Sequence, residues 1–421
     1  MEKMYLCIDL KTFYASVECV ERNLDPFKTN LVVADPNRKS GAICLAISPA
    51  MKALGIKNRC RIFEIPKNVK YITAMPRMKK YIDYAANVYA VYLKYIAPED
   101  IHVYSIDEAF MDVTSYLKLY NMTAKELAIV IMNDIFQTLK ITATAGIGTN
   151  MYLAKIALDI TAKHVADNIG YLDETKYQKE LWHHLPLTDF WQIGQGITKH
   201  LAKLGIYDMY DIAHAPEERL YKEFGINAKL LIDHAYGIEP CTIADIKNYK
   251  SKTKSLSNSQ ILFKDYNFED TRIVVKEMVD ILSLGLVENH FYCRAISLRI
   301  NYSKECISST GGSKRLLKPS DTYHDLVQAF LSIYDKTTKR DYPIRKISLS
   351  VNDVTAKPVK QLDLFSTVEK SDTDRKIANV MNQIKHKYGK NAILKGIDLT
   401  EAATTKKRNK LIGGHNSGEE V

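Results

Sequence analysis

The chain has 421 residues, of which 46% are hydrophobic and 26% charged, and its formal net charge is +10, values typical of a soluble globular protein with two to four domains. No apolar run approaches the ~20 residues of a membrane span, and no basic stretch with a cleavage site indicates a signal peptide, so we expect no membrane partner. The seven cysteines form no CxxC pair and no zinc spacing, which favours free thiols in a reducing compartment and a cytoplasmic location.

The first predicted strand, Met4 to Asp9, ends its apolar run on a carboxylate. Residues 10–18 then form a turn into a helix, which places Phe13 and Tyr14 one turn past the strand. Two core aromatic residues would be the commoner explanation of this pair. A rigid ring at this place would alternatively press on the sugar of a bound nucleotide and exclude a 2′-hydroxyl.

Residues 25–75 form a small α/β insertion that is rich in Lys and Arg. Its short helix begins at Pro49 and ends at Gly55, which follows the preference for proline at the start of a helix and glycine past its end. Lys52 on this helix is a candidate phosphate ligand. The next predicted helix, Arg77 to Ala97, carries a tyrosine stripe that favours a packing face over a cofactor site.

The run from Ile101 to Thr114 alternates apolar and polar residues, which predicts a buried strand or a tight hairpin. It contains two adjacent carboxylates, Asp107 and Glu108, which are costly to bury unless they are paired. If the strand that ends at Asp9 lies beside this run, three oxygen donors converge, as Mg²⁺ prefers. The alternative is that Asp107 and Glu108 cap a turn in solvent, and the apolar flanks argue against it.

A helix over residues 123–139, with a capping box at its start, and a strand over 141–148 follow. Asn150 is then predicted to cap a helix over 151–162. Lys155, in the first turn of that helix, could reach the β- and γ-phosphates of a nucleotide as a point charge. A solvated surface lysine is the alternative.

Residues 171–240 are predicted to be helical. Within them, Trp191 to Gly205 form a helix, a hairpin with Gly194 and Gly196, and a second helix. Backbone N–H groups and a helix N-terminus at such a hairpin could bind the phosphates of a duplex without reading its sequence. No strand precedes the two glycines, so they are not a dinucleotide-binding fingerprint.

Positive charge is concentrated in the second half of the chain. Residues 241–360 carry 20 Lys and Arg against 13 Asp and Glu, whereas residues 1–240 carry 28 of each. Such an excess is typical of a polyanion-binding module, although solubility alone would explain it equally well. A basic linker at 249–257 and alternating strands and helices over 258–355 precede the last ~60 residues, which we expect to form a polar tail with one or two short helices.

The tail contains two motifs. Gln361 to Phe365, Gln-Leu-Asp-Leu-Phe, stands in polar surroundings, so its apolar side chains are predicted to be exposed as in a docking peptide. A fragment of amphipathic strand is the alternative. The second motif, Thr404 to His415, has no physical explanation from sequence, and its basic residues could contact DNA or another subunit.

The three carboxylates and the helical lysines together describe two-metal phosphoryl transfer, in which two ions roughly 3.5–4 Å apart hold the attacking and leaving oxygens. Asp9 and Asp107 would bridge two Mg²⁺ ions, for which Mn²⁺ could substitute. The carbonyl of Leu10 could add a ligand, and Glu108 would hold the ion nearest the attacking hydroxyl.

Three segments resemble, in order and spacing, the catalytic motifs of the Y-family DNA polymerases, and within that family the bacterial and phage UmuC branch. They are Asp9–Glu18, with Tyr14 at the steric-gate position, Ser105–Asp112, and Ala145–Ala157. The resemblance covers nearly the whole chain and implies an enzyme, a low-fidelity DNA-directed DNA polymerase that bypasses template lesions in DNA repair and SOS mutagenesis. Many relatives have a Tyr and an Arg where Pro49 and Lys52 stand here, but the UmuC branch also has Lys at the second position.

The resemblance also implies an α+β, multidomain, right-hand architecture. The palm is expected at 1–26 and 76–170, small fingers at 27–75, a helix-hairpin-helix thumb at 171–243, a linker at 244–257, an α/β little finger at 258–356, and a tail with a clamp-binding motif at 357–421.

The implied partners are primer-template DNA, a deoxynucleoside triphosphate, a sliding clamp of the beta type and accessory SOS proteins. The nucleotide would contact Phe13, Tyr14, Lys52 and Lys155. DNA would contact Gly194, Gly196, Lys199, Lys252, Lys254, Arg294, Arg299 and Lys346. The clamp would bind Gln361, Leu362, Leu364 and Phe365.

Two other classes of protein stay open on the sequence. A palm-type nucleotidyl cyclase would share the carboxylates and metals, but it would need neither the glycine hairpin nor the basic second half. A non-catalytic DNA-binding protein recruited by the clamp would not need three intact carboxylates.

Overall fold

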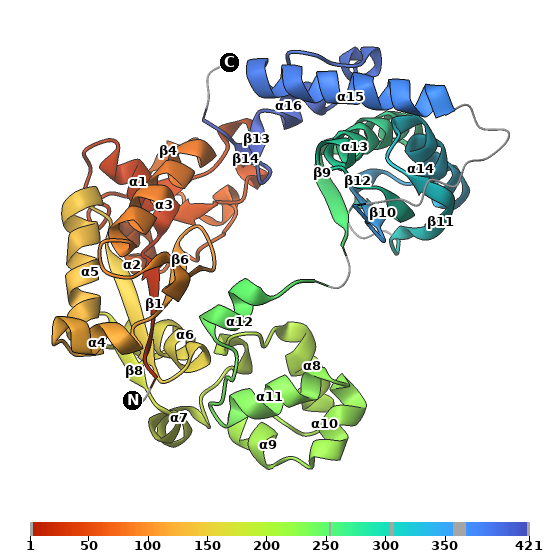
Figure 1. The fold of residues 1–421 in the computed structure, drawn as a ribbon. Helices are drawn as coiled ribbons and strands as arrows, with labels where there is room; N and C mark the ends of the chain where they lie inside the picture. Colours follow the sequence, from red (N-terminus) through yellow and green to blue (C-terminus); the bar gives the residue numbers. More distant parts are fainter. Residues whose placement is uncertain (1–2, 252–253, 304–306, 357–367, 419–421) are drawn as a thin grey trace. The chain divides into compact units, whose positions relative to one another are not determined.

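The structure is a computed structural model that describes residues 3–251, 254–303, 307–356 and 368–418, apart from the side chains of Lys39 and of residues 368–372. The chain forms two compact units, Met1–Tyr249 with Ser417–Val421 and Lys250–Asn416. Figure 1 shows the helices and strands of each unit. In the described part of the chain, no helix is both long and apolar enough to cross a membrane.

A five-stranded sheet lies in the first unit, in the segments that were expected to form the palm. Its strand order is β5-β6-β1-β7-β8, and all neighbours are antiparallel except β7 and β8. The strands are β1 (Tyr5–Leu10), β5 (Ile101–Val103), β6 (Glu108–Asp112), β7 (Ala143–Gly148) and β8 (Ile169–Leu172). The helices of this region are α1 (Phe13–Val20), α3 (Met78–Tyr92), α4 (Thr114–Tyr120), α5 (Ala124–Leu139) and α6 (Met151–Asp159).

Glycine allows α6 to pack directly on the sheet. A Cβ atom at Gly146 of β7 would lie 2.0 Å from the carbonyl oxygen of Ala154, and one at Gly148 would lie 2.3 Å from the nitrogen of Ala154. No side chain tolerates such short distances. The predicted cap is confirmed, because the Asn150 side chain accepts the N–H of Leu153 at 2.8 Å. The glycines of the strand and the cap of the helix therefore fix where α6 begins relative to β7.

A three-stranded sheet, β3-β2-β4, forms the insertion. Its elements are β2 (Leu31–Val33), β3 (Ala46–Ile47), α2 (Pro49–Ala53) and β4 (Ile72–Ala74). Ser48 caps α2 by accepting the N–H of Met51, with Pro49 at the first helical position, as expected.

Helices dominate residues 174–248. They are α7 (Glu174–Leu181), α8 (Gln195–Lys203), α9 (Met209–His214), α10 (Glu217–Phe224), α11 (Asn227–Ala235) and α12 (Ile243–Asn248). Two expectations need correction. Only a 3₁₀ turn, Leu187–Asp189, precedes Gly194 where a helix was predicted. The predicted linker at 244–257 begins inside α12, whose Ile243 is buried in a cluster with Tyr5 of β1 and Phe110 of β6.

The second unit is built on a four-stranded antiparallel sheet of order β11-β10-β12-β9. The strands are β9 (Leu256–Tyr266), β10 (Cys293–Tyr302), β11 (Thr310–Ser320) and β12 (Ile344–Asn352), and the helices that contact them are α13 (Phe268–Glu288) and α14 (Tyr323–Thr337). From Ile296 to Tyr302, alternate side chains of β10 are buried, and Ile296, Leu298 and Ile300 belong to the core of this unit. The other face of the sheet carries serines and basic side chains.

The tail differs from its prediction as short helices in an unpacked segment. It contains a 21-residue helix, α15 (Val368–Tyr388), followed by α16 (Thr405–Arg408) and a hairpin of β13 (Leu411–Ile412) and β14 (His415–Asn416). Asn382 of α15 donates to the carbonyl of Leu284 in α13 at 3.0 Å. The prediction from polar composition was wrong because α15 packs through partly buried side chains and has few large apolar ones.

Candidate active site

The three predicted carboxylates come from β1, from β6 and from the turn just before β6, and the two strands are neighbours in the five-stranded sheet. Asp9 and Glu108 are Cα partners in the β1–β6 ladder, and residues directly opposite in an antiparallel pair place their side chains on the same face. Asp107 stands in the turn just before β6, and its carbonyl accepts the N–H of Leu10 at 2.9 Å. Asp9, Leu10, Asp107 and Glu108 are thus brought together where two strands meet.

Electrostatics at this corner fit a cation site. Burial, together with the charges of Asp107 and Glu108, raises the pKa of Asp9 to about 7. A divalent cation would offset both causes, since it favours the ionised form of each carboxylate. The donor set consists of hard oxygens, which suits Mg²⁺ or Mn²⁺. In the described part of the chain, however, no three acidic, His or Cys side chains are already arranged to hold an ion.

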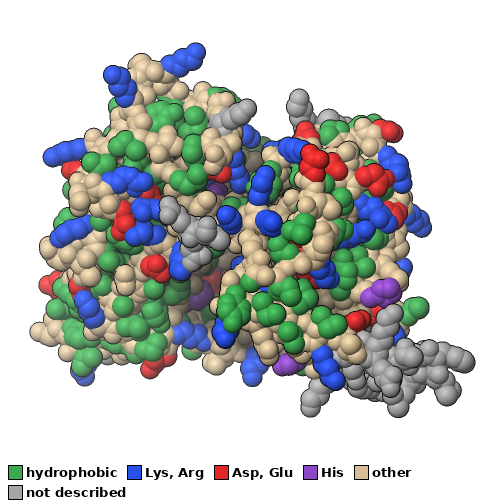
Figure 2. Space-filling model, turned by 90° about the horizontal axis from the view of Figure 1, so that it is seen from above, with side chains coloured by type: hydrophobic (Ala, Val, Ile, Leu, Met, Phe, Trp, Pro, Cys, Tyr) green, Lys and Arg blue, Asp and Glu red, His purple; other side chains and the backbone are tan. Residues whose placement is uncertain are grey.

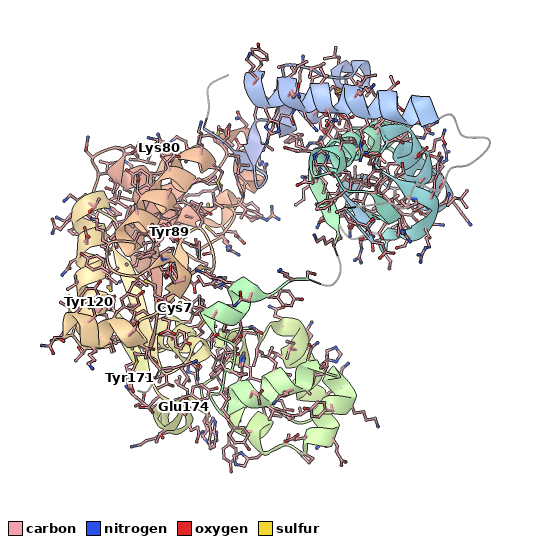
Figure 3. All side chains as sticks on the ribbon, viewed as in Figure 1. Cys7, Lys80, Tyr89, Tyr120, Tyr171 and Glu174 are labelled. Atoms are coloured by element: carbon pink, nitrogen blue, oxygen red, sulfur yellow. The ribbon has the colours of Figure 1, made fainter. Side chains whose placement is uncertain are left out.

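Lys155 pairs with the acidic cluster. It lies in the second turn of α6 and is buried, and its Nζ is 2.7 Å from Oε1 of Glu108 and 3.0 Å from Oδ2 of Asp159. Although burial opposes it, the charges of these two carboxylates raise the pKa of Lys155. Cys7, labelled in Figure 3, also donates its S–H to Glu108 at 3.2 Å. Lys155 is therefore a partner of the acidic cluster and not a solvated surface lysine.

The two aromatic residues of α1 have different surroundings. Phe13 is only 2% exposed and belongs to the core, as the commoner explanation held. Tyr14 is partly exposed, and burial with the charge of Asp107 raises its pKa. Its ring centroid lies 4.8 Å from that of Tyr81 in α3. Tyr14 thus borders the acidic cluster, and the buried rings of Phe13 and Tyr81 pack against the ring of Tyr14.

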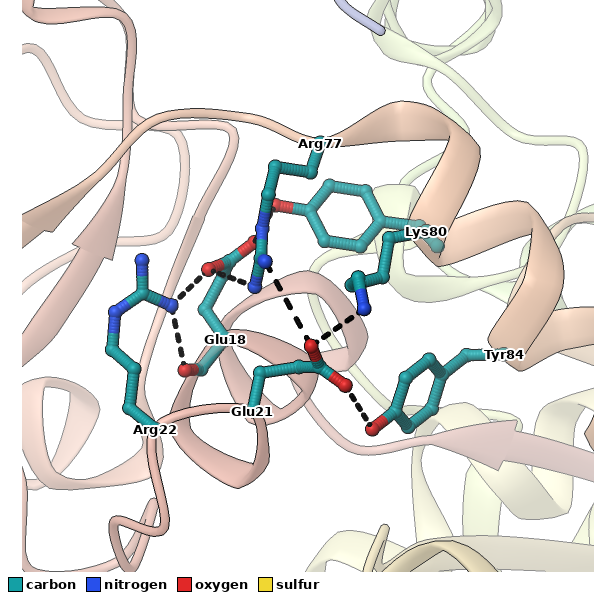
Figure 4. Close-up of polar contacts among 7 residues, drawn as sticks. Glu18, Glu21, Arg22, Arg77, Lys80 and Tyr84 are labelled. Carbon is teal, nitrogen blue, oxygen red and sulfur yellow. Dashed lines mark hydrogen bonds and ion pairs between the residues drawn. The ribbon is translucent and has the colours of Figure 1, made fainter. Parts of the chain in front are cut away.

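A buried carboxylate, Glu18 of α1, joins this helix to the start of α3 (Figure 4). Arg77 donates to both carboxylate oxygens of Glu18 at 2.9 Å, and the hydroxyl of Tyr81 donates at 2.7 Å. Arg22 also donates to this carboxylate. Although burial opposes it, the hydrogen bonds from Arg77, Tyr81 and Arg22 lower the pKa of Glu18. Sequence reasoning missed this network because Arg77 and Tyr81 lie 59 and 63 residues from Glu18 in the chain.

Replacing Glu18 with glutamine should destabilise the protein by about 3 kcal/mol, because the guanidinium groups of Arg77 and Arg22 lose the buried carboxylate with which they pair. Glu21, which is partly exposed and also lies near Arg77 at 3.7 Å, provides the matched control, for which we expect about 1 kcal/mol or less. Urea unfolding at pH 7 measures both values. Equal losses in the two variants would contradict the account.

The same network predicts a pH dependence of stability. Because the folded-state pKa of Glu18 is lowered below its ordinary value of 4.5, its contribution is complete above that pH and is lost as the pH falls through the folded pKa. The stability difference between wild type and Glu18→Gln should therefore shrink in acid.

Basic side chains surround Asp9. Burial lowers the pKa of Lys52, against the charge of Asp9, which raises it. Burial and the charge of Lys52 likewise lower the pKa of Lys11, whose ammonium pairs with Asn168. Lys11 was not singled out from the sequence, although its place two residues after Asp9 in the motif was a usable signal. These two lysines could hold phosphate groups beside the carboxylates.

The predicted DNA contacts lie in both units. Gly194 is the N-cap of α8, and Gly194, Gly196 and Lys199 are exposed. Lys346 is exposed on β12, and Arg299 on β10 donates to Ser309 at 3.0 Å. Figure 2 shows Lys and Arg side chains spread over the visible face and mixed with Asp and Glu. Net charge alone therefore does not mark the binding surface.

Other candidates fit less well or cannot be placed. Lys254 lies over the ring of Phe291, 5.1 Å from its centroid. Within the described residues, Nε of Arg294 is buried without a hydrogen-bond partner. Lys252 and the segment Gln361–Phe365, with Leu362 and Leu364, lie outside the described residues.

Comparisons with known proteins agree along the chain. The model of the impB/mucB/samB family matches residues 8–159, and the model of its C-terminal domain matches residues 253–364. UvrX of Bacillus subtilis (strain 168), named for UV-damage repair, is 32% identical over 420 residues, which cover 99% of this chain and 98% of UvrX. DNA polymerase IV 2 of the same organism is 30% identical over 432 residues, which cover 98% of this chain and 99% of that polymerase.

Among solved structures, the "Y-family DNA polymerase chimera Dbh-Dpo4(243-245)-Dbh" matches with a TM-score of 0.64. The identity is 21%, and the match covers 84% of this chain and 100% of the chimera. At this identity the likeness supports the fold.

Proposed function

Because this chain belongs to the impB/mucB/samB family, the UmuC-like Y-family DNA polymerases, we propose that the cluster of Asp9, Asp107 and Glu108 is its polymerase active site. The protein is an enzyme, a DNA-directed DNA polymerase of the lesion-bypass type. Its substrates are primer-template DNA and deoxynucleoside triphosphates. The primer 3′-hydroxyl attacks the α-phosphate of the nucleotide, and pyrophosphate leaves.

One observation carries the assignment of the site. Asp9 and Glu108 are register partners, Asp107 adjoins them through the N–H of Leu10, and the pKa of Asp9 is raised to about 7 by burial and by its two neighbours. Enzymes of this family require metal. When bound, two Mg²⁺ ions on these carboxylates and the Leu10 carbonyl, with Mn²⁺ as a substitute, would neutralise the developing charge and polarise the phosphate.

The chain's own residues would position the nucleotide. Lys11 and Lys52 would hold its phosphates as point charges, which leaves the α-phosphate near the carboxylates. Tyr14 would lie against the deoxyribose, at the place where a 2′-hydroxyl would project. Positioning and electrostatics supply most of the rate in such reactions, since the protein does little covalent chemistry.

Lys155 has two roles in this proposal. Beside Glu108 it stabilises a buried negative charge in the absence of nucleotide. When the nucleotide enters, its ammonium can move to the triphosphate and leave Glu108 to the metal. Both positions keep the ammonium paired, so the exchange buries no uncompensated charge.

Primer extension tests the function directly. The full chain with Mg²⁺ should extend a primer on an undamaged template and past a single abasic site, and EDTA should stop both reactions. A nucleotidyl cyclase would instead convert deoxynucleoside triphosphate to a cyclic product without DNA, and that outcome, or no extension on either template, would contradict the proposal.

Low fidelity is part of the proposal. The insertion that would act as fingers is small, with a three-stranded sheet and a five-residue helix α2, and so little protein can enclose the nascent base pair only loosely. Weak shape checking lowers discrimination between correct and incorrect pairs. DNA would be held through phosphates by the N-terminus of α8 and the open face of the second unit's sheet, so affinity should fall with salt.

Deleting Gln361–Phe365 should abolish stimulation by a beta-type clamp and leave unassisted synthesis unchanged. The reason is that a docking peptide raises the local concentration of polymerase at a ring on DNA without altering the active site. Primer extension with and without clamp measures the ratio. Clamp stimulation that survives the deletion would place docking elsewhere on the chain.

A further inference from the structure

The chain crosses between the two units twice. It leaves the first unit at Tyr249 and returns to it at Ser417. The crossing near residue 250 was expected as a linker, whereas the return was not. We call residues 411–418, which contain the β13–β14 hairpin, the return segment.

The motif that sequence reasoning left unexplained anchors the chain before the return segment. Thr404 and Thr405 are buried on α13, where Glu277, itself 1% exposed, accepts the N–H of both at 2.9–3.0 Å and the hydroxyl of Thr404 at 2.9 Å. Arg408 donates to Gln260 of β9 at 3.0 Å. The conspicuous Thr-Thr pair is therefore an anchor on the second unit, since each donor meets a buried carboxylate that would otherwise be costly.

The end of the return segment contacts the start of α3. The carbonyl of Ser417 accepts the N–H of Lys79 at 2.9 Å. This N–H lies in the first turn of α3, whose N-cap, Arg77, makes no side-chain cap, so Ser417 satisfies a donor that the helix itself cannot. Gly418 has a φ of +84°, and a Cβ atom there would lie 2.8 Å from Cβ of Arg77.

Arg77 connects this contact to the nucleotide site. It is the bidentate partner of Glu18, which also accepts the hydroxyl of Tyr81, and the ring of Tyr81 lies 4.8 Å from that of Tyr14. A shift of Arg77 would therefore be transmitted through Glu18 and Tyr81 to the residue that borders the sugar position.

We propose that Ser417 and Gly418 are positioning residues for Tyr14, acting through Arg77, and that sugar selection thereby depends on the return segment. This inference rests on the proposed role of Tyr14. Gly418 is required because only a residue without Cβ can approach Arg77 this closely in this backbone conformation.

A pair of matched substitutions tests the inference. Gly414 has the same φ, +84°, but a Cβ atom there would meet no described heavy atom within 4 Å. Gly418→Ala and Gly414→Ala therefore impose the same backbone strain, and they differ in the contact with Arg77. The assay is single-nucleotide incorporation by the full chain, which yields kcat and KM for a deoxynucleotide and its matching ribonucleotide.

Gly418→Ala should lower the deoxyribose-to-ribose selectivity about tenfold, less than the 10²-fold that a 1 Å misplacement can cost, and should raise the deoxynucleotide KM more than it lowers kcat. Gly414→Ala should change either value less than about twofold. A chain that ends at Asn416, which removes the contact without crowding Arg77, should behave like Gly418→Ala.

Coupling through Arg77 also predicts the effect of a double substitution. On an Arg77→Ala background, Gly418→Ala should have no additional effect, because the intermediary is gone. Equal behaviour of the two glycine variants, or additive effects with Arg77→Ala, would overturn the inference.

The role of Tyr14 in sugar selection and the role of the return segment can be disproved independently. If Tyr14→Ala alters sugar selectivity but Gly418→Ala does not, the proposed role of Ser417 and Gly418 is wrong, while the steric-gate role of Tyr14 is supported. If Tyr14→Ala leaves selectivity unchanged, the gate is wrong, and the deoxynucleotide KM of the two glycine variants still decides whether the return segment acts on the nucleotide site.

Discussion

Replacing Asp107 with alanine should lower the rate of nucleotide addition by at least about 10³-fold, equivalent to roughly 4 kcal/mol of transition-state stabilisation. Asp107 sits in the turn where β6 begins, and its backbone is fixed by the N–H of Leu10, so the loss should come from the carboxylate and not from unfolding. The measurement is single-turnover primer extension at saturating nucleotide, since metal ions supply several kcal/mol in such reactions.

A control separates this effect from a general loss of acidic charge. Asp83 is an exposed carboxylate on α3, and Asp83→Ala should retain wild-type rates within about twofold, as surface substitutions usually do. Asp9→Ala and Glu108→Ala should resemble Asp107→Ala. Synthesis that is unchanged in the Asp107 variant would remove this cluster as the active site.

The second large effect is expected at Tyr14. Tyr14→Ala should reduce discrimination against ribonucleotides by about 10²-fold, because specificity of this kind comes from a clash that the wrong substrate cannot avoid. The ring is partly exposed beside the acidic cluster and is supported by Tyr81. Competition between a deoxynucleotide and its ribonucleotide in primer extension measures the ratio.

Tyr14→Phe is the matched control. It retains the ring that would exclude the 2′-hydroxyl and removes only the phenolic oxygen, so sugar selectivity should stay within a few-fold of wild type. Phe13→Ala provides a contrast, because Phe13 is buried and its loss should lower stability by about 3–5 kcal/mol. Selectivity that is unaffected by Tyr14→Ala would contradict the steric-gate assignment.

The carboxylates could be predicted because local sequence and local structure agree there. Strand alternation, a carboxylate at the end of β1 and a second pair at the start of β6 are all visible within a few residues, and the observed register brings Asp9 opposite Glu108. The caps of α5 and α6 and the proline that begins α2 were predictable for the same reason, since each depends on residues that are close in sequence.

Interactions over long sequence separations could not be predicted. Neither the contact of Lys155 with Glu108 nor that of Arg77 with Glu18 leaves a local pattern, because a lysine or arginine with a buried head has the same composition signature as an exposed one. The tail shows the same limit. Its polar sequence predicted an unpacked segment, but Thr404 and Thr405 are buried by hydrogen bonds to Glu277, without large apolar side chains.

A crystal structure would show whether Asp9, Asp107 and Glu108 bind the catalytic ions. The crystal would contain the full chain with primer-template DNA, a non-hydrolysable deoxynucleotide and Mn²⁺, located by anomalous scattering. We expect two Mn²⁺ ions ligated by Asp9, Asp107 and Glu108, with Lys155 moved from Glu108 to the triphosphate. Ions bound elsewhere, or Lys155 still paired with Glu108 while the nucleotide is in place, would contradict this expectation.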